Sequence, residues 1–599
     1  MTVQNQADYA NAVINFKLKS PLKNTIAQEV KVIDNIKIER DYTTRGWVIQ
    51  NTPALSIAIK SRIILQAGFG EVIKQLKDIE DLIDVWVLVR NLNFKAKIID
   101  IVGPMDDHRD RLLSLATTET IRQHLQQADP QEWVVRLQGN YDYPLGCLQP
   151  SLDLVTLEKL GLHLPQVTSY LRLQPEKRRE MVEKLAKIIR KQPDWVSMER
   201  QPHFFTTAAH IGCSQQIRFG NHYIAEHQKQ TLIQNLRRHG VYLKAPQFIE
   251  NSTLKIGLID ARKNMINTGF SKDLKSCLQA IGFTTHISST QRITEISLST
   301  LEQAVDHIQQ QSVDLILALL PQKTATSEPI YHRLKRLTIN QGIPSQMIYE
   351  QTLANPYAVN NVVMGILAKT GNTLFTLAQP LDFTDFVVGL DVARDRKRNS
   401  PGSINTTAIT RIYTNGGQLL NYRLHDSALE GETLPRHVLE MLFPRSQFVS
   451  KRVVIHRDGP FRGEEKQILR EIAIQLNAQF YCVEIRKTGF PRLYRLNSQG
   501  KVQQPQKGDI LKLSDTEALL VSSLPPFANA TAQPLSVISD PSLGIERAIQ
   551  SVLALTLLHL GSVPQPRLPV SIYYSDKIGY LALKGIKPPD LDGHLPFWL

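Results

Sequence analysis

Residues 387–395 read VVGLDVARD, and this stretch decides the fold expected for the C-terminal part of the chain. The run from Phe386 to Leu390 contains only apolar residues and glycine, as in a strand buried on both faces of a sheet. It ends in Asp391, and a carboxylate at the end of a buried strand is costly unless it binds a cation. A single such residue is more often a helix cap or a hydrogen-bonding loop residue. The stretch therefore predicts a central strand with an acidic group at its end, whose role depends on its neighbours.

Three further acidic residues that could act together with Asp391 follow later in the sequence. Asp458 ends a second apolar strand, Asp576 lies in a short polar segment near the C-terminus, and Glu432 lies in a loop before Pro435. Carboxylates that converge from strand ends are what a two-metal phosphodiesterase needs to hold two Mg²⁺ or Mn²⁺ ions. Glu432 is favoured over the nearby Glu430 because it directly precedes the short segment that leads into a helix. These four residues form the candidate catalytic and metal-binding set.

The spacing of apolar residues predicts two domains in the C-terminal part of the chain. With 599 residues the chain is too long for one hydrophobic core, and three to five domains are expected. Residues 250–379 alternate strands and helices like a Rossmann-like parallel α/β domain, and residues 380–599 read as a second α/β domain with antiparallel strands. The absence of a GxGxxG motif disfavours a dinucleotide cofactor.

The N-terminal part is expected to consist of connectors around one small domain. Residues 1–70 are strand-like and resemble a connector rather than a domain. Residues 71–168 combine short strands with a helix over residues 110–127, which is typical of a small α+β or barrel-like module. Residues 169–249 form a second linker with an amphipathic helix that starts at Pro175.

Composition narrows the class of function. Seventy Lys and Arg against 56 Asp and Glu give a net charge of +14, which favours a polyanionic partner such as nucleic acid. The four cysteines lie far apart and form no CxxC motif, so neither a zinc module nor a disulfide scaffold is expected, and a cytoplasmic location fits. No secretory signal and no membrane span are expected either.

Four segments taken together resemble the PIWI domain of prokaryotic Argonaute proteins, a domain with an RNase H-like fold. The resemblance implies a metal-dependent endonuclease whose catalytic Asp-Glu-Asp-Asp tetrad is Asp391, Glu432, Asp458 and Asp576. Asp385 and Asp395 flank Asp391, but neither ends the apolar run. The four segments are VVGLDVARD (387–395), LEGETLP (429–435), VVIHRDGPFRGEE (453–465) and IYYSDKIGYLALKG (572–585).

The preceding domain is similar to the MID domain, which in this family anchors the 5′ end of a guide strand. The resemblance rests on IYHRLKRLTINQGIPSQMIYE (330–350) and GILAKTGN (365–372), and it implies a 5′-phosphate pocket formed by Tyr331, Lys335, Gln346 and Lys369. Tyr331 and Lys335 are one helical turn apart, so the ring can stack on a terminal base while the lysine meets a phosphate. Without the PIWI context, two surface lysines and a half-buried tyrosine would be the simpler interpretation.

Weaker similarities extend to both ends of the chain. The C-terminal HLPFWL is suited to burial at the domain junction, and in many relatives the terminal carboxylate, here on Leu599, helps a metal ion bind the guide phosphate. NTPALSIAIKSRI (51–63) is similar to the linker before the PAZ domain, and residues 71–168 look like a compact PAZ domain that holds the guide 3′ end. About forty residues precede this linker, so the N domain of longer relatives is expected to be truncated or absent.

The sequence thus predicts a monomeric, guide-directed endonuclease that acts in host defence against plasmids and phage. Two divalent ions (Mg²⁺ or Mn²⁺) and a 5′-phosphorylated guide are the expected cofactors, and a complementary strand is the expected target. DNA is expected for both strands, although no residue can be shown to read the 2′-hydroxyl that distinguishes RNA. Two alternatives remain: a catalytically idle guide-binding module that recruits a partner nuclease, and a guide-independent nuclease.

Overall fold

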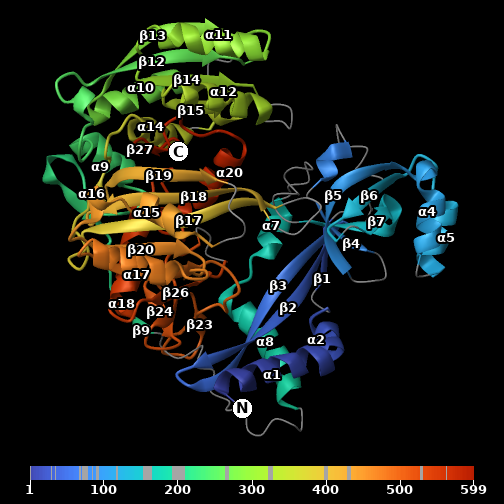
Figure 1. The fold of residues 1–599 in the computed structure, drawn as a ribbon. Helices are drawn as coiled ribbons and strands as arrows, with labels where there is room; N and C mark the ends of the chain where they lie inside the picture. Colours follow the sequence, from blue (N-terminus) through green and yellow to red (C-terminus); the bar gives the residue numbers. More distant parts are fainter. Residues whose placement is uncertain are drawn as a thin grey trace.

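Two bodies of unequal size are joined by a long hairpin in the computed structural model (Figure 1). The larger body holds a parallel sheet above a ten-stranded sheet, and the smaller body holds the short strands β4 to β7. The structure describes residues 2–27, 30–33, 36–65, 69, 79–83, 85–89, 94–116, 119–139, 141–152, 165–191, 209–262, 269–321, 328–355, 357–396, 403–427, 433–525, 530–561 and 563–599.

The upper domain of the larger body is a parallel α/β sheet, as predicted. Its strands follow the order β13-β12-β14-β15, and every neighbouring pair is parallel. The central strand β14 is buried along its whole length, which explains its uninterrupted apolar sequence. The strands are β12 (Thr253–Asp260), β13 (Thr284–Arg292), β14 (Leu315–Leu320) and β15 (Ser345–Tyr349), and the helices are α9 (Leu232–His239), α10 (Phe270–Ile281), α11 (Leu298–Gln309), α12 (Glu328–Asn340), α13 (Glu350–Leu353) and α14 (Ala358–Lys369).

The lower domain is built on a mixed sheet with the strand order β27-β19-β18-β17-β20-β21-β26-β25-β24-β9. β17 (Phe386–Arg396) pairs antiparallel with β18 (Ser403–Thr414) and parallel with β20 (Arg452–Asp458). This arrangement agrees with the predicted RNase H-like domain. The other strands are β19 (Leu419–Ser427), β21 (Gln479–Arg486), β24 (Asp509–Lys512), β25 (Glu517–Leu520), β26 (Leu535–Ser539), β27 (Asp592–Gly593) and β9 (Ala209–His210).

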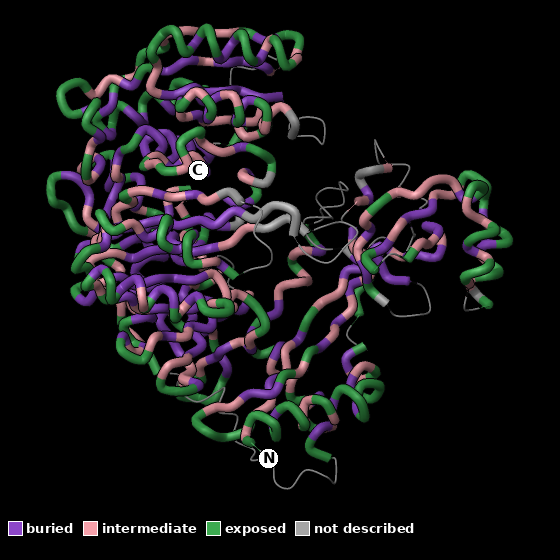
Figure 2. Tube along the Cα trace, in the orientation of Figure 1, coloured by how far each residue is buried: buried purple, intermediate pink, exposed green. Residues whose placement is uncertain are grey.

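Helices cover this sheet, and its strands are largely buried (Figure 2). One apolar core continues from the parallel sheet into the ten-stranded sheet, so the two domains share an interior. The penultimate residue, Trp598, belongs to this core and is 1% exposed, as expected for an apolar tail at the junction. The helices are α15 (Arg436–Leu442), α16 (Arg445–Phe448), α17 (Glu465–Gln475), α18 (Ile545–Leu555), α19 (Val570–Tyr573) and α20 (Ser575–Leu583).

The hairpin that joins the two bodies consists of β2 (Ile36–Ile49) and β3 (Thr52–Leu65), paired in register along their whole length. Its tip docks on the larger body, where Trp47 packs against Phe490 and Leu493. At its other end the hairpin continues into an eight-stranded sheet with the order β1-β2-β3-β8-β4-β5-β6-β7. The remaining strands of this sheet are β1 (Val30–Ile33), β4 (Trp86–Val89), β5 (Phe94–Pro104), β6 (Trp133–Leu137), β7 (Tyr141–Pro144) and β8 (Leu148–Leu152).

Two expectations for the N-terminal part are wrong in detail. Residues 1–70 were expected to be strand-like, but the chain starts with helices α1 (Val3–Lys17) and α2 (Lys19–Ile26). Thr2 caps α1, and apolar side chains at helical spacing pack the two helices on the hairpin and on α8 (Pro175–Arg190). The single helix expected over residues 110–127 is described as α4 (Arg109–Leu115) and α5 (Glu119–Gln127).

The smaller elements complete the description. Among the described residues, no helix combines the length and apolarity that crossing a bilayer would require. The predicted helix start at Pro175 is confirmed, since Pro175 is the first residue of α8. The elements not yet named are α7 (Pro165–Leu171), a three-stranded sheet of β10 (Gln216–Arg218), β11 (Ile224–Glu226) and β16 (Thr376–Leu377), and the pair β22 (Arg495–Leu496) and β23 (Val502–Gln503).

Candidate functional site

Asp391 and Asp458 lie next to each other where the parallel pairing of β17 with β20 ends. Asp458 ends β20 as predicted, but β17 continues past Asp391 to Arg396, still paired with β18, so the prediction that this strand ends at Asp391 is wrong. The two aspartates belong to adjacent parallel strands, and the residues before them, Leu390 and Arg457, are direct partners in the β17–β20 register. Asp391 is 8% exposed, and Asp458 is partly buried. The strand pattern therefore brings the two predicted carboxylates together, and we refer to Asp391 and Asp458 as the carboxylate pair.

Each carboxylate has a cationic neighbour. Arg457 Nη1 lies 3.5 Å from Asp391 Oδ1, and Lys487 Nζ lies 2.6 Å from Asp458 Oδ2. Burial raises the pKa of Asp391 above its ordinary value, and the positive charge of Arg457 offsets part of this shift. A further cation would stabilise the ionised form of a buried carboxylate whose pKa is raised. The surroundings of Asp391 and Asp458 are therefore electrostatically suited to bind a cation.

The other two members of the predicted tetrad are described less completely. Glu432 lies outside the described residues, and for Asp576 the structure describes the backbone, in the first turn of α20, but not the side chain. Among the described side chains, no three His, Cys, Asp or Glu residues come together as a metal site. The structure therefore brings two of the four residues together, and the full tetrad stays a prediction.

The donor chemistry of the carboxylate pair fits Mg²⁺ or Mn²⁺. Carboxylate oxygens are the ligands that these hard cations prefer, and because burial raises the pKa of Asp391, a further cation would stabilise its charged form. Asp385, directly before β17, instead forms an ion pair with Arg452. It accepts hydrogen bonds from the backbone N–H of Arg452 at 2.8 Å and from its guanidinium at 3.1 Å.

Glu465 is a residue of this site that sequence reasoning missed. Its side chain is fully buried and accepts hydrogen bonds from the backbone N–H of Leu434 at 3.0 Å and of Arg462 at 3.1 Å. Arg457 Nε also lies 3.4 Å from it, which links Glu465 to Asp391 through one guanidinium. Glu465 thus anchors the chain two residues after Glu432. The only feature of the sequence that could have pointed to Glu465 is the pair Glu464-Glu465 at the start of a helix.

A second cluster of charge lies between the two domains. Lys335 on α12 is 2% exposed, and Lys369 at the end of α14 is 4% exposed. Lys369 Nζ donates hydrogen bonds to Gln346 Oε1 at 2.6 Å and to the Ser345 carbonyl at 3.0 Å. The structure therefore brings Lys335, Lys369 and Gln346 of the predicted phosphate pocket together, in the interior rather than on the surface.

A third lysine joins this cluster from the other domain. Lys577 follows Asp576 in α20, and its positive charge lowers the pKa of both Lys335 and Lys369 in addition to the larger effect of burial. The pKa of Lys335 falls to about 7. We call Lys335, Lys369 and Lys577 the lysine cluster. Lys335 and Lys369 are buried and Lys577 is exposed beside them, and an anion would stabilise these three neighbouring positive charges.

The two remaining predicted pocket residues are placed less directly. Tyr331 lies on α12 one turn before Lys335, and its ring stacks against Tyr349 with centroids 6.4 Å apart. Leu599 is partly buried against the core shared by the two domains. The C-terminus lies between the parallel sheet and the ten-stranded sheet, close to α14 and β27 (Figure 1). A role for its carboxylate in phosphate binding stays a prediction.

Comparisons with known proteins agree with this architecture. The family model described as "Piwi domain" matches residues 315–587, which include the carboxylate pair and the lysine cluster. Protein argonaute of Aquifex aeolicus is 26% identical over 489 residues, which make up 78% of this chain and 66% of that protein. The chain is therefore similar to Argonaute proteins, within the part that matches the Piwi domain and beyond it. Its match therefore spans just under two thirds of the length of that relative.

Solved structures of Argonautes show the same fold over the whole chain. The crystal structure of the A. aeolicus Argonaute covers 100% of this chain and 85% of its own, at a TM-score of 0.68 and 20% identity. The structure of the Clostridium butyricum Argonaute bound to a guide DNA and a 19-mer target DNA covers 100% of this chain and 89% of its own. Its TM-score is 0.75 at 15% identity. At these identities the likeness shows the fold alone.

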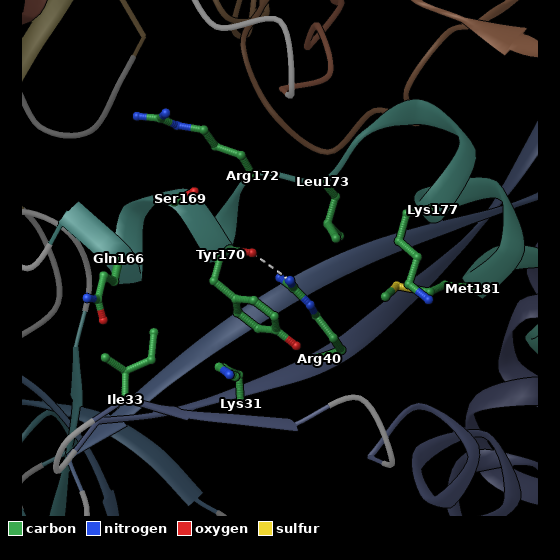
Figure 3. A pocket seen from close by; sticks show the side chains of 10 residues that line it. All are labelled: Lys31, Ile33, Arg40, Gln166, Ser169, Tyr170, Arg172, Leu173, Lys177 and Met181. Carbon is green, nitrogen blue, oxygen red and sulfur yellow. Dashed lines mark hydrogen bonds between the residues drawn. The ribbon is translucent and has the colours of Figure 1, made fainter.

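A separate cavity of about 500 Å³ lies beneath the hairpin, away from both clusters (Figure 3). Arg40 and Tyr170 lie side by side in its lining: the Arg40 guanidinium lies over the Tyr170 ring, 4.4 Å from the ring centroid, and Arg40 Nη2 donates a hydrogen bond of 2.6 Å to the Tyr170 carbonyl. The cavity lies between the hairpin and the helices α7 and α8, and none of the predicted site residues lines it. Its lining is Lys31, Ile33, Arg40, Gln166, Ser169, Tyr170, Arg172, Leu173, Lys177 and Met181.

Proposed function

We propose that this protein binds a short 5′-phosphorylated guide strand and cleaves a complementary strand by metal-dependent phosphodiester hydrolysis. The observation that carries the proposal is the lysine cluster, because two buried lysines, Lys335 and Lys369, with a third positive charge beside them are unfavourable without an anion. A terminal phosphate supplies that anion. The stacked Tyr331 then offers a surface for the terminal base.

The carboxylate pair supports the nuclease half of the proposal. Asp391 and Asp458, together with Asp576 and Glu432, would hold two divalent ions, Mg²⁺ or Mn²⁺. When bound there, such ions supply activation of water and stabilisation of the leaving oxygen. The protein's own residues hold these carboxylates in place: Arg457 links Asp391 to Glu465, and Glu465 fixes the chain after Glu432.

Sequence specificity is assigned to base pairing with the guide. The protein then contacts mainly the backbones of both strands, which its net charge of +14 favours. The module of residues 71–168 is proposed to hold the guide 3′ end, and Tyr141, which is 57% exposed, is its best candidate for stacking on a base. Trp133 is only partly exposed and packs against the core of the module.

DNA is proposed for both guide and target, with host defence in the cytoplasm as the role. The DNA assignment follows the C. butyricum Argonaute, which was solved with a guide DNA and a target DNA. All four cysteines of this chain are free thiols, in keeping with a reducing compartment.

One experiment tests both halves of the proposal. Purified protein is incubated with Mn²⁺, a 5′-phosphorylated DNA guide and a labelled complementary strand of DNA or RNA. The expected result is a guide-dependent cut at one fixed position, which Asp391→Ala abolishes while guide binding is retained. Tight guide binding without cleavage of either target would support the alternative of a guide-binding module. Cleavage without a guide would contradict the proposal.

A further inference from the structure

Helix α20 contributes to both clusters with consecutive residues. It spans Ser575–Leu583, and Asp576 and Lys577 both lie in its first turn. Asp576 is a member of the predicted tetrad, and Lys577 is part of the lysine cluster. Because consecutive residues project about 100° apart around a helix, one short helix can serve two neighbouring sites. A movement of α20 would therefore displace a residue of the predicted tetrad and a residue of the lysine cluster together.

The helix is packed tightly on the sheet that carries the carboxylate pair. α20 contacts β17 and β18. A Cβ atom added at Gly579 would lie 2.2 Å from the Cβ of Ala393, which follows Asp391 by two residues. This distance leaves no space for a side chain at Gly579, so the helix is in direct contact with β17, the strand that carries Asp391.

The same helix is tied to the domain that carries Lys335 and Lys369. Arg336 Nη2, on α12, donates a hydrogen bond of 2.8 Å to the Lys584 carbonyl at the end of α20. The hydroxyl of Tyr580 lies 3.3 Å from His332 Nε2, also on α12. α12 is the helix that carries Lys335, so the contacts between α12 and α20 flank the lysine cluster.

Arg411 joins the first turn of α20 to the carboxylate pair. This residue of β18 is fully buried, and its Nη2 donates a 2.6 Å hydrogen bond to Ser575 Oγ and another to the Ser571 carbonyl. Its Nε and Nη1 have no hydrogen-bond acceptor in the described part of the chain. The charge of the guanidinium is instead stabilised by the fields of Asp391 and Asp458. Arg411 thus bonds to the residue directly before Asp576 while its charge interacts with the other two aspartates.

We infer that α20, positioned by Arg411, couples the lysine cluster to the nuclease centre. Binding of a 5′-phosphate at Lys577 fixes the first turn of α20 and with it Asp576, so the phosphate raises metal affinity and the cleavage rate, beyond its effect on guide affinity. This inference rests on the proposed function. Because coupling free energies are reciprocal, metal binding also tightens the binding of a 5′-phosphorylated guide. Arg411 acts as a positioning residue and contacts no substrate.

The coupling is tested with two guides of one sequence, bearing a 5′-phosphate or a 5′-hydroxyl. Each guide is loaded to saturation, and single-turnover cleavage is then measured, so that a difference in affinity cannot contribute. In the wild type, the phosphorylated guide should give a rate roughly ten-fold higher, within the usual range of coupling between sites. Equal rates at saturation would overturn the inference.

Variants of Arg411 and Ser575 separate positioning from general stability. Arg411→Met and Ser575→Ala should reduce the ratio of the two rates toward one, and Arg411→Lys should restore part of it. Ser575→Ala removes only the hydroxyl acceptor, so it reports on the coupling even if Arg411→Met does not fold. Thermal unfolding of each variant is measured in parallel. A folded Ser575→Ala that keeps the full ratio would contradict the role of this contact.

A measurement without cleavage keeps this test independent of the proposed nuclease activity. Mn²⁺ binding is titrated with either guide present and no target strand. The 5′-phosphate should tighten Mn²⁺ binding roughly ten-fold in the wild type. The double variant Asp391→Ala/Asp458→Ala corrects for Mn²⁺ bound by the guide itself. If the wild type cuts nothing but shows this difference, the nuclease proposal fails and the coupling stands; equal Mn²⁺ affinity with both guides overturns the coupling.

Discussion

Lys487 Nζ lies 2.6 Å from Asp458 Oδ2, so an ammonium group is paired with one of the four carboxylates proposed to bind the metal ions. A divalent ion that binds Asp458 must compete with this ion pair. Lys487→Gln should therefore tighten Mn²⁺ binding to the nucleic-acid-free protein roughly ten-fold, which corresponds to about 1.4 kcal/mol. Calorimetric titration of the nucleic-acid-free protein measures this Mn²⁺ affinity. Lys466→Gln is the matched control, because Lys466 pairs with Glu484, 2.8 Å away. Unchanged or weaker binding in Lys487→Gln would show that the lysine does not compete.

The preference for a 5′-phosphorylated guide should depend on pH. In the protein alone, burial and the charge of Lys577 lower the pKa of Lys335 to about 7. A bound phosphate favours the protonated lysine, so above pH 7 binding must be accompanied by proton uptake. The affinity ratio of 5′-phosphate to 5′-hydroxyl guides should fall by up to about ten-fold per pH unit as the pH rises from 7 to 9. A ratio that is constant over this range would contradict a buried, neutralised Lys335.

The same lysine should destabilise the ligand-free protein. The pKa of Lys335 is lower in the folded state than in the unfolded state, so the unfolded state binds the proton more tightly. The resulting loss of folding free energy is fully present below about pH 7, and it decreases as the pH rises toward the pKa of the lysine in the unfolded state. Lys335→Met should therefore raise the free energy of unfolding by about 1–4 kcal/mol at pH 6, and by less at pH 9. Denaturant unfolding at both pH values measures this. A Lys335→Met protein less stable than the wild type at pH 6 would refute the argument.

Gly389 should not tolerate a side chain. A Cβ atom there would lie 1.7 Å from the Ser571 carbonyl oxygen, where α19 packs on β17, the strand that carries Asp391. Gly389→Ala should cost at least about 1–3 kcal/mol of stability, because the helix must move away from the sheet. Gly212→Ala is the control, since a Cβ atom added at Gly212 would have no heavy atom within 4 Å. Thermal unfolding compares the two, and equal midpoints would contradict the close packing.

Glu465 should matter for cleavage more than for guide binding. Glutamine at this position replaces one carboxylate oxygen by an amide NH₂, so either Leu434 or Arg462 loses the acceptor of its backbone N–H. Glu465→Gln should destabilise the protein by about 1–3 kcal/mol and slow cleavage at saturating guide by roughly ten-fold or more. Guide affinity should stay within about two-fold. Glu464→Gln, at the exposed neighbouring position, should leave cleavage unchanged. A parallel loss of guide affinity in Glu465→Gln would assign the residue a general structural role.

The sequence predicted the strands of the larger body because their apolar runs are long and their burial is uniform. The residues from Phe386 to Leu390 and from Ser345 to Tyr349 lie in strands as expected. Helix α1 was missed because only Ala7 and Ile14 are buried in it, which leaves a weak helical signal. Lys577 and Arg411 could not be predicted from local pattern. Each acts across a contact between segments 160 or more residues apart in the chain, which only the packed structure reveals.

The adjacency of Asp576 and Lys577 also restricts how this protein can change during evolution. Inserting or deleting one residue before them would turn both side chains by about 100° around the helix axis and displace them by about 1.5 Å along it. No such change could adjust the metal site without also disturbing the phosphate site. If Asp576 binds a metal ion and Lys577 a phosphate as proposed, the two functions are therefore inherited as one unit.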